Sequence, residues 1–217
     1  MSREKGLSRG SLLHRLARFY VVGFHDVTIL SDCPLPRSGP ALLVSNHISG
    51  LDPVVYQSLC PRRIVWMMAS EYYEMKTLRW FYRAVDAIPV HRNNRDTAAV
   101  RAALRKLAEG EIVGLFPEGR IGSEGEVLPF QNGVAMLALK SGAPVYPAFI
   151  EGTSRGADML DSFLYPHRLY VAFGPAIVPD AGQRHQDRLD RTANLIHEAV
   201  RSLRQHLPRG EKVVEKS

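Results

Sequence analysis

Hydrophobic positions fall into two patterns along the chain, short continuous runs and stretches with helical spacing. Continuous runs are typical of buried strands, and apolar residues repeating every three or four positions are typical of amphipathic helices. The runs predict strands over residues 41–45, 64–69, 87–90, 112–116, 145–150 and 168–173. The spaced patterns predict helices over residues 51–59, 71–82, 96–110, 133–141 and 187–206. Their alternation predicts an α/β fold, a single domain with a mostly buried mixed sheet flanked by helices.

The first thirty residues form a separate unit that predicts an N-terminal amphipathic helix. Its apolar residues recur at helical spacing, with arginines among them: Leu12, Leu13, Leu16, Phe19, Tyr20 and Phe24, with Arg9, Arg15 and Arg18. A basic helix of this kind can lie in a membrane interface, and the alternative is an ordinary helix packed on the domain. We interpret residues 1–30 as a membrane-interface segment, 31–207 as the main domain and 208–217 as a flexible tail.

Composition narrows the choice of compartment and partner. The 217 residues carry a formal net charge of +6, which suggests nucleic acid, an anionic membrane or a phosphorylated substrate as partner. The two cysteines form neither a disulfide framework nor a zinc site, and the polar N-terminus does not resemble a secretory signal. No run of about 18 apolar residues predicts a transmembrane helix. We therefore expect a reduced, cytosolic environment and no metal.

The segment Ser45-Asn46-His47-Ile48-Ser49-Gly50-Leu51-Asp52-Pro53 lies between a predicted strand and a predicted helix. A turn can bring the Asp52 carboxylate against one imidazole nitrogen of His47, leaving the other nitrogen to take a proton from a substrate hydroxyl. The carboxylate would then fix the tautomer and stabilise the imidazolium. The alternative is a helix cap, with Asn46 or Ser49 capping the helix and Asp52 in its first turn.

A second strand-to-loop segment, Phe116-Pro117-Glu118-Gly119-Arg120, combines a carboxylate, a guanidinium and a glycine. Arginine can hold phosphate oxygens in a forked geometry, and glycine permits close backbone approach. The alternative is a surface turn with an ion pair. A cluster of aromatic residues at 72–82 has helical spacing, which favours core packing or membrane contact over stacking with nucleic acid bases.

Together, these two segments and two others in order resemble the glycerolipid acyltransferase family, which includes 1-acylglycerol-3-phosphate and glycerol-3-phosphate acyltransferases. The other two blocks are 87–92, sequence Ala-Ile-Pro-Val-His-Arg, and 143–147, sequence Ala-Pro-Val-Tyr-Pro. The resemblance implies that His47 is the general base and that Asp52 orients it. It assigns acceptor binding to Arg92, which holds the phosphate, and to Glu118 and Gly119, with Arg120 as a further candidate.

The resemblance also implies substrates and location. The donor would be acyl-CoA or an acyl-carrier protein, used without metal, cofactor or acyl-enzyme. The acceptor would be 1-acylglycerol-3-phosphate, with glycerol-3-phosphate or another lysolipid as the alternative. The protein would act at the cytoplasmic face of the cell membrane, attached peripherally, and would not bind nucleic acid. An acyl-thioester hydrolase and a non-catalytic basic binder are the competing classes.

Three departures from the family pattern leave the acceptor open. Asp86 stands where the second block usually carries glycine, and its negative charge lies close in sequence to Arg92. Arg120 follows Gly119 directly, where the family commonly continues Gly-Thr-Arg-Ser. Gln131 stands after Phe130, where a lysine is often found. Fewer cations at this site would suit an acceptor other than lysophosphatidate.

Overall fold

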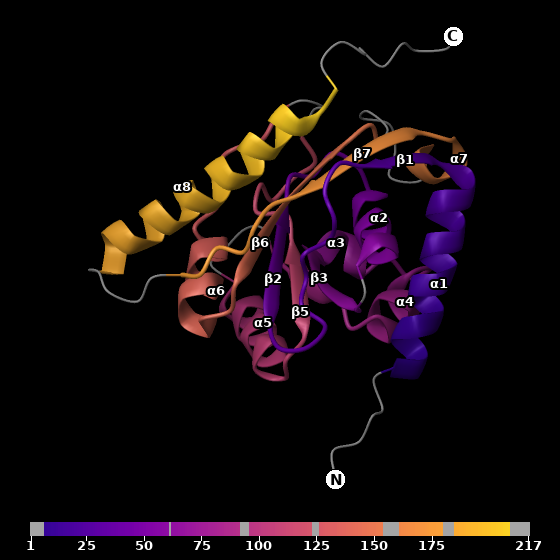
Figure 1. Ribbon diagram of the computed structural model, residues 1–217. Helices are drawn as coiled ribbons and strands as arrows, with labels where there is room; N and C mark the ends of the chain where they lie inside the picture. Colours follow the sequence, from indigo (N-terminus) through magenta and orange to yellow (C-terminus); the bar gives the residue numbers. More distant parts are fainter. Residues whose placement is uncertain are drawn as a thin grey trace.

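A computed structural model describes residues 7–60, 62–91, 96–122, 126–153, 161–179 and 185–208. Its centre is a seven-stranded sheet with the order β1-β7-β6-β2-β5-β3-β4 (Figure 1). β7 pairs antiparallel with β6 and parallel with β1, and every other neighbouring pair is parallel, so the predicted mixed sheet is confirmed. The strands are β1 (Asp26–Ile29), β2 (Ala41–Ser45), β3 (Ile64–Ala69), β4 (Ile88–Val90), β5 (Ile112–Leu115), β6 (Val145–Glu151) and β7 (Arg168–Phe173).

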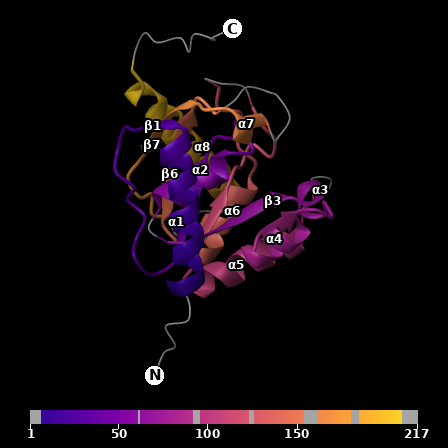
Figure 2. The ribbon, with the colours of Figure 1, turned by 90° about the vertical axis from the view of Figure 1, so that its right-hand side faces the viewer.

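Helices cover both faces of the sheet (Figures 1 and 2). They are α1 (Leu7–Phe24), α2 (Asp52–Leu59), α3 (Ser70–Tyr73), α4 (Arg79–Ala84), α5 (Thr97–Ala108), α6 (Gly133–Ser141), α7 (Asp161–Leu164) and α8 (His185–Leu203), which continues as a 3-10 turn over Arg204–His206. Successive residues of β2 alternate between two cores. Leu42 and Val44 pack with apolar residues of α5, α6 and α8, whereas Ala41 and Leu43 pack with those of α1 and α2. This explains why the first four residues of β2 are all apolar.

Three strands deliver their following loops to one edge of the sheet. β2 pairs in parallel with β5 through Val44 and Leu115, and with β6 through Ser45 and Ala148. The loops after residues 45, 115 and 151 therefore leave the sheet at the same side. This edge brings together the His47–Asp52 segment, the 116–122 segment and Thr153. Open α/β sheets bind their ligands at this edge.

Helix α1 combines the two alternatives considered for the N-terminal segment. One face packs on the domain: Val21 is buried, His14 Nδ1 lies 2.9 Å from the Gln57 carbonyl oxygen, and the Tyr20 hydroxyl donates to the Phe163 carbonyl at 2.7 Å. The other face exposes large apolar side chains, above all Phe19 at 82%. Among the described helices, none is long and apolar enough to cross a membrane.

The prediction of one helix over residues 71–82 is wrong. The segment forms two short helices, α3 and α4, joined by a turn in which the Met75 N–H donates to the Tyr72 carbonyl and the Leu78 N–H to the Met75 carbonyl. No residue of α4 is buried, so it lacks the packed face that sustains a longer helix. The aromatic cluster is therefore not core packing at Trp80, which is exposed.

Two elements were not predicted, β1 and α7. β1 is an edge strand whose side chains are mostly exposed, so its sequence has no buried apolar run. It pairs with β7 and thus contributes to the sheet before residue 31, where we placed the start of the main domain. The predicted tail at 208–217 lies outside the described residues beyond Pro208.

Helix α5 begins at Thr97, next to the predicted start at residue 96. The Asp96 carboxylate accepts hydrogen bonds from the backbone N–H groups of Ala98 and Ala99, at 3.0 and 2.9 Å. Gly110, with a φ of +81°, lies just beyond its end.

Candidate active site

His47 and Asp52 form a direct pair at the carboxyl end of β2. His47 Nδ1 lies 2.8 Å from Asp52 Oδ2. The Asp52 side chain is completely buried, while the His47 side chain is 19% exposed. A buried carboxylate therefore holds a histidine whose other ring nitrogen, Nε2, is the one available to a substrate.

Asp52 is held by more than the histidine. Its Oδ2 also accepts hydrogen bonds from the backbone N–H groups of Ile48 and Ser49, at 2.8 and 3.0 Å. Its Oδ1 accepts the hydroxyl of Thr153 at 2.7 Å. Several donors to one carboxylate stabilise its charged form, which compensates for its removal from water. The carboxylate is thus fixed in position before any substrate binds.

The helix-cap alternative is right that Asp52 lies in the first turn of α2, but neither Asn46 nor Ser49 caps the helix. Residue Leu51 occupies the N-cap of α2 without a side-chain cap, and Asn46 instead bonds to β6. The Asn46 amide donates to the Ile150 carbonyl at 2.8 Å and accepts the Ile150 N–H at 2.9 Å. Asn46 therefore ties the start of the loop to the neighbouring strand, and Asp52 faces back toward His47.

Two aromatic rings support the imidazole. The ring of Phe116 stacks on His47 with centroids 4.1 Å apart and planes 12° apart. The indole of Trp66, on β3, stacks on the other side of Phe116 at 4.9 Å and 7°. This stack limits rotation of the imidazole and leaves its edge as the exposed part.

Glu118 lies buried beside the pair. Burial raises the pKa of Glu118 to about 7, and the negative charge of Asp52 adds to that effect. The backbone amides of His47 and Leu128 and the charge of Arg120 act in the opposite direction. Neither amide makes a hydrogen bond of normal geometry to Glu118, which agrees with the dominance of burial. With a pKa of about 7, the Glu118 carboxyl group can be protonated and donate a hydrogen bond, or be ionised and accept one.

Glycines close the 116–122 segment onto the site. Gly119 has a φ of +70°, and a Cβ there would lie 2.3 Å from Gln131 Nε2. The Gly122 N–H donates to the His47 carbonyl at 2.7 Å, and a Cβ on Gly122 would lie 3.0 Å from Glu118 Oε2. The positive φ of Gly119 favours glycine at that position. The segment thereby links Glu118 to the backbone of His47.

The remaining candidates are less closely placed. Arg120 is exposed at the rim of the same loop, and Arg92 lies outside the described residues. Asp86, which departs from the family pattern, pairs with Arg63 at 2.8 Å and with Lys106 at 3.5 Å. The negative charge of Asp86 is therefore paired with those two cations. Within the part of the chain that the structure describes, no group of three or more His, Cys, Asp or Glu side chains is placed to hold a metal ion.

Two supporting residues, Thr153 and Trp66, were not singled out from the sequence. Thr153 lies 101 residues after Asp52, and Trp66 belongs to β3, whereas Phe116 follows β5. No local spacing signals such contacts, because they depend on the order of strands in the sheet. Phe116 was noted as part of its motif, but its stacking role needed the structure.

The site combines a buried carboxylate with a partly exposed histidine at one edge of a mixed sheet, an arrangement typical of enzymes that use acid–base chemistry. Comparison with known proteins agrees with that class. The family model described as Acyltransferase matches residues 26–151, which include His47, Asp52 and Glu118. The chain therefore belongs to the Acyltransferase family.

Individual relatives support the assignment. The chain is 29% identical over 126 residues to a 1-acyl-sn-glycerol-3-phosphate acyltransferase of Bacillus subtilis, covering 58% of this chain and 62% of that protein. It is also 29% identical over 167 residues to one from Limnanthes alba, covering 75% and 59%. It thus spans about three fifths of the length of these curated relatives.

A solved structure shares the fold. The crystal structure of the 1-acyl-sn-glycerophosphate acyltransferase PlsC from Thermotoga maritima superposes with a TM-score of 0.73 at 22% identity. The match covers 94% of this chain and 81% of that one. The likeness establishes the architecture, the single α/β domain predicted from the sequence.

Proposed function

We propose that this protein is an O-acyltransferase that moves a fatty acyl group from acyl-CoA or acyl-carrier protein to the hydroxyl of 1-acylglycerol-3-phosphate. The observation that carries the proposal is the His47–Asp52 pair, 2.8 Å apart at the ligand-binding edge of the sheet. The two relatives described above are 1-acyl-sn-glycerol-3-phosphate acyltransferases, which supports the choice of acceptor.

In the proposed reaction, Nε2 of His47 takes the proton of the acceptor hydroxyl as its oxygen attacks the thioester carbonyl carbon. Asp52 stabilises the imidazolium, because its buried carboxylate lies against the protonated Nδ1. The carbon–sulfur bond then breaks, and the imidazolium returns its proton to the leaving thiolate. The acceptor supplies the nucleophile, so the reaction needs no acyl-enzyme, metal or cofactor.

Glu118, Gly119 and the arginines would bind the acceptor. Glu118 is buried next to His47, and in its neutral form can donate a hydrogen bond to an acceptor oxygen. Gly119 allows the backbone to approach the substrate closely. Arg92 and Arg120 would hold the phosphate, because guanidinium groups bind phosphate oxygens in a forked geometry.

The proposal includes peripheral attachment to the cytoplasmic face of the membrane through α1. Its outward face exposes Leu12, Leu16, Phe19 and Val22, with Arg15 and Arg18 exposed beside them. Apolar side chains flanked by cations suit an interface of lipid chains and anionic headgroups. Attachment would present the enzyme to an acceptor that itself resides in the bilayer.

The test is an acyl-transfer assay with product identification. Purified protein is incubated with labelled acyl-CoA and one acceptor at a time. The acceptors are 1-acylglycerol-3-phosphate, glycerol-3-phosphate and other lysolipids. We expect acceptor-dependent formation of phosphatidic acid from 1-acylglycerol-3-phosphate. Thioester loss at the same rate without acceptor would instead identify a hydrolase, and acylation of a different lysolipid alone would correct the acceptor.

A further inference from the structure

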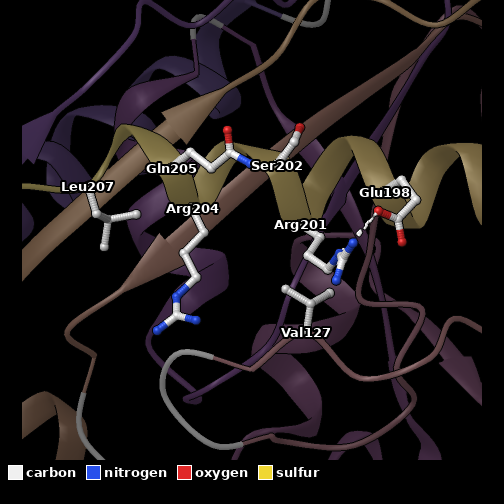
Figure 3. A pocket seen from close by; sticks show the side chains of 7 residues that line it. All are labelled: Val127, Glu198, Arg201, Ser202, Arg204, Gln205 and Leu207. Atoms are coloured by element: carbon white, nitrogen blue, oxygen red, sulfur yellow. Dashed lines mark hydrogen bonds and ion pairs between the residues drawn. The ribbon is translucent and has the colours of Figure 1, made fainter. Parts of the chain in front are cut away.

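A groove with a volume of about 580 Å³ lies along the C-terminal end of α8, outside the site described above. Its lining comes from α8, the following 3-10 turn and Val127: Val127, Glu198, Arg201, Ser202, Arg204, Gln205 and Leu207. Figure 3 shows Arg201 and Arg204 extending from the same side of the helix, Arg201 beside Val127 and Arg204 away from it. The volume falls in the range of small-molecule sites, about 300–1,000 Å³.

The charge of the groove suits a phosphorylated ligand. Arg201 and Arg204 are 63% and 52% exposed, so both guanidinium groups are accessible. Arg201 pairs with Glu198 at 2.7 Å, and Arg204 lies 3.9 Å from Glu151. An exposed ion pair between neighbouring helix residues contributes little free energy, so a phosphate can replace Glu198 as the partner of Arg201. Ser202 and Gln205 add neutral hydrogen-bonding groups.

The groove adjoins the active site through one chain segment, residues 126–131. On one side, Leu128 Cδ1 would lie 3.5 Å from a Cβ on Gly122, the residue that bonds to His47. On the other side, the Val127 carbonyl lies 3.4 Å from His197 Nε2, and the Phe130 ring packs edge-on against His197 at 4.9 Å. The segment therefore separates the histidine site from the α8 groove.

The end of β6 makes a second connection. Thr153 donates to the catalytic carboxylate, Asp52, at 2.7 Å. Two residues earlier, Glu151 faces Arg204 of the groove at 3.9 Å. The end of β6 therefore contacts both the histidine site and the α8 groove.

We infer that the α8 groove binds the phosphorylated nucleotide end of coenzyme A and thereby positions the acyl-CoA donor. The inference rests on the proposed function. Coenzyme A carries a 3′-phosphate and a diphosphate on its nucleotide, and a flexible pantetheine arm ends in the thioester. A groove with two exposed arginines beside the site can hold a compact, phosphorylated nucleotide. A carrier protein, by contrast, would dock on a broad surface.

The experiment measures binding and turnover in the Arg201→Gln/Arg204→Gln variant. Calorimetry with coenzyme A itself, and with 3′-dephospho-coenzyme A, reads the groove without catalysis. We expect at least a tenfold rise in the Kd for coenzyme A and in the KM for acyl-CoA, with the KM for the acceptor unchanged. The matched control is Arg101→Gln/Arg105→Gln on α5, which removes two exposed arginines of the same charge elsewhere.

The possible results distinguish a failure of the groove assignment from a failure of the proposed reaction. An unchanged Kd in the variant, an equal effect in the control, or no binding of coenzyme A to the wild type would overturn the inference. An equal rise in the KM for an acyl-carrier-protein donor would also overturn it, because that donor lacks the nucleotide. If the wild type binds coenzyme A through these arginines but transfers no acyl group, the groove stands and the proposed function fails.

Discussion

The replacement Asp52→Asn isolates the charge of the carboxylate from its hydrogen bonds. An amide oxygen in the place of Oδ2 can still accept from His47 and from the Ile48 and Ser49 N–H groups. The amide NH2 would then face the Thr153 hydroxyl, whose oxygen can accept its hydrogen bond. We therefore expect the variant to fold and to keep the imidazole in place.

The expected loss is in the rate. Two unit charges about 4 Å apart interact by about 4 kcal/mol at an effective dielectric constant of about 20, the value suited to partly buried pairs. The imidazolium forms only as the proton is transferred, so this stabilisation is lost from the transition state. A tenfold change in rate corresponds to about 1.4 kcal/mol, so kcat should fall by about a thousandfold. The assay is steady-state acyl transfer at saturating substrates.

A second replacement at the same position checks the reasoning. Asp52→Ala removes the acceptor for two buried backbone N–H groups, and each unsatisfied group costs about 1–3 kcal/mol. It should therefore lower the melting temperature clearly, whereas Asp52→Asn should lower it little. A folded Asp52→Asn protein that retains more than about a tenth of the wild-type kcat would refute the role of the charge.

The remaining predictions address the acceptor, pH and the membrane. Arg92→Ala should raise the KM of the acceptor by about tenfold or more, because one phosphate contact is lost, and should change the KM of the donor little. Equal effects on both KM values would count against this role. Burial raises the pKa of Glu118 from its ordinary value of 4.5 to about 7. The folded state therefore binds more protons between pH 4.5 and 7, and its stability falls as pH rises through that window. Glu118→Gln should remove this part of the decline in melting temperature, and an identical profile in both proteins would contradict it. Leu16→Ser/Phe19→Ser should reduce sedimentation with anionic vesicles, and more so at high salt, where the attraction of the arginines to anionic lipid is screened. The control Leu195→Ser, on α8 and as exposed as Leu16, should not reduce it. Unchanged sedimentation of the α1 variant would place the attachment elsewhere.

Point substitutions suit α1 better than its removal. Val21 is buried, and the helix contacts α2 through His14 and α7 through Tyr20. Deletion of residues 1–24 would therefore expose core as well as remove the apolar face. Phe19 is 82% exposed, so its replacement tests the membrane contact with little effect on folding.

Features that depend on neighbouring residues could be predicted from the sequence. β2 and β5 are buried on both faces, so their continuous apolar runs identify them without knowledge of their partners. His47 and Asp52 are five positions apart, and a single turn determines whether they meet. The fold class was therefore accessible to pattern alone, whereas the choice of this pair over a helix cap came from the family resemblance.

Features that depend on distant contacts could not be predicted in this way. β1 is mostly exposed and is ordered by its pairing with β7, some 140 residues later in the chain, as Asp26 opposite Arg168 shows. Thr153 reaches Asp52 only because β6 lies beside β2. The break between α3 and α4 reflects the lack of a buried face, which sequence spacing does not reveal.

The central claim is that His47 is the base of an acyl transfer. The most direct measurement is the transfer of labelled acyl groups to 1-acylglycerol-3-phosphate by His47→Ala, with folding verified by thermal melting. His47 is partly exposed on a loop, so its removal should leave the fold intact. The account predicts that acceptor-dependent product disappears while the melting temperature stays near that of the wild type. A folded His47→Ala protein that transfers the acyl group at close to the wild-type rate would contradict it.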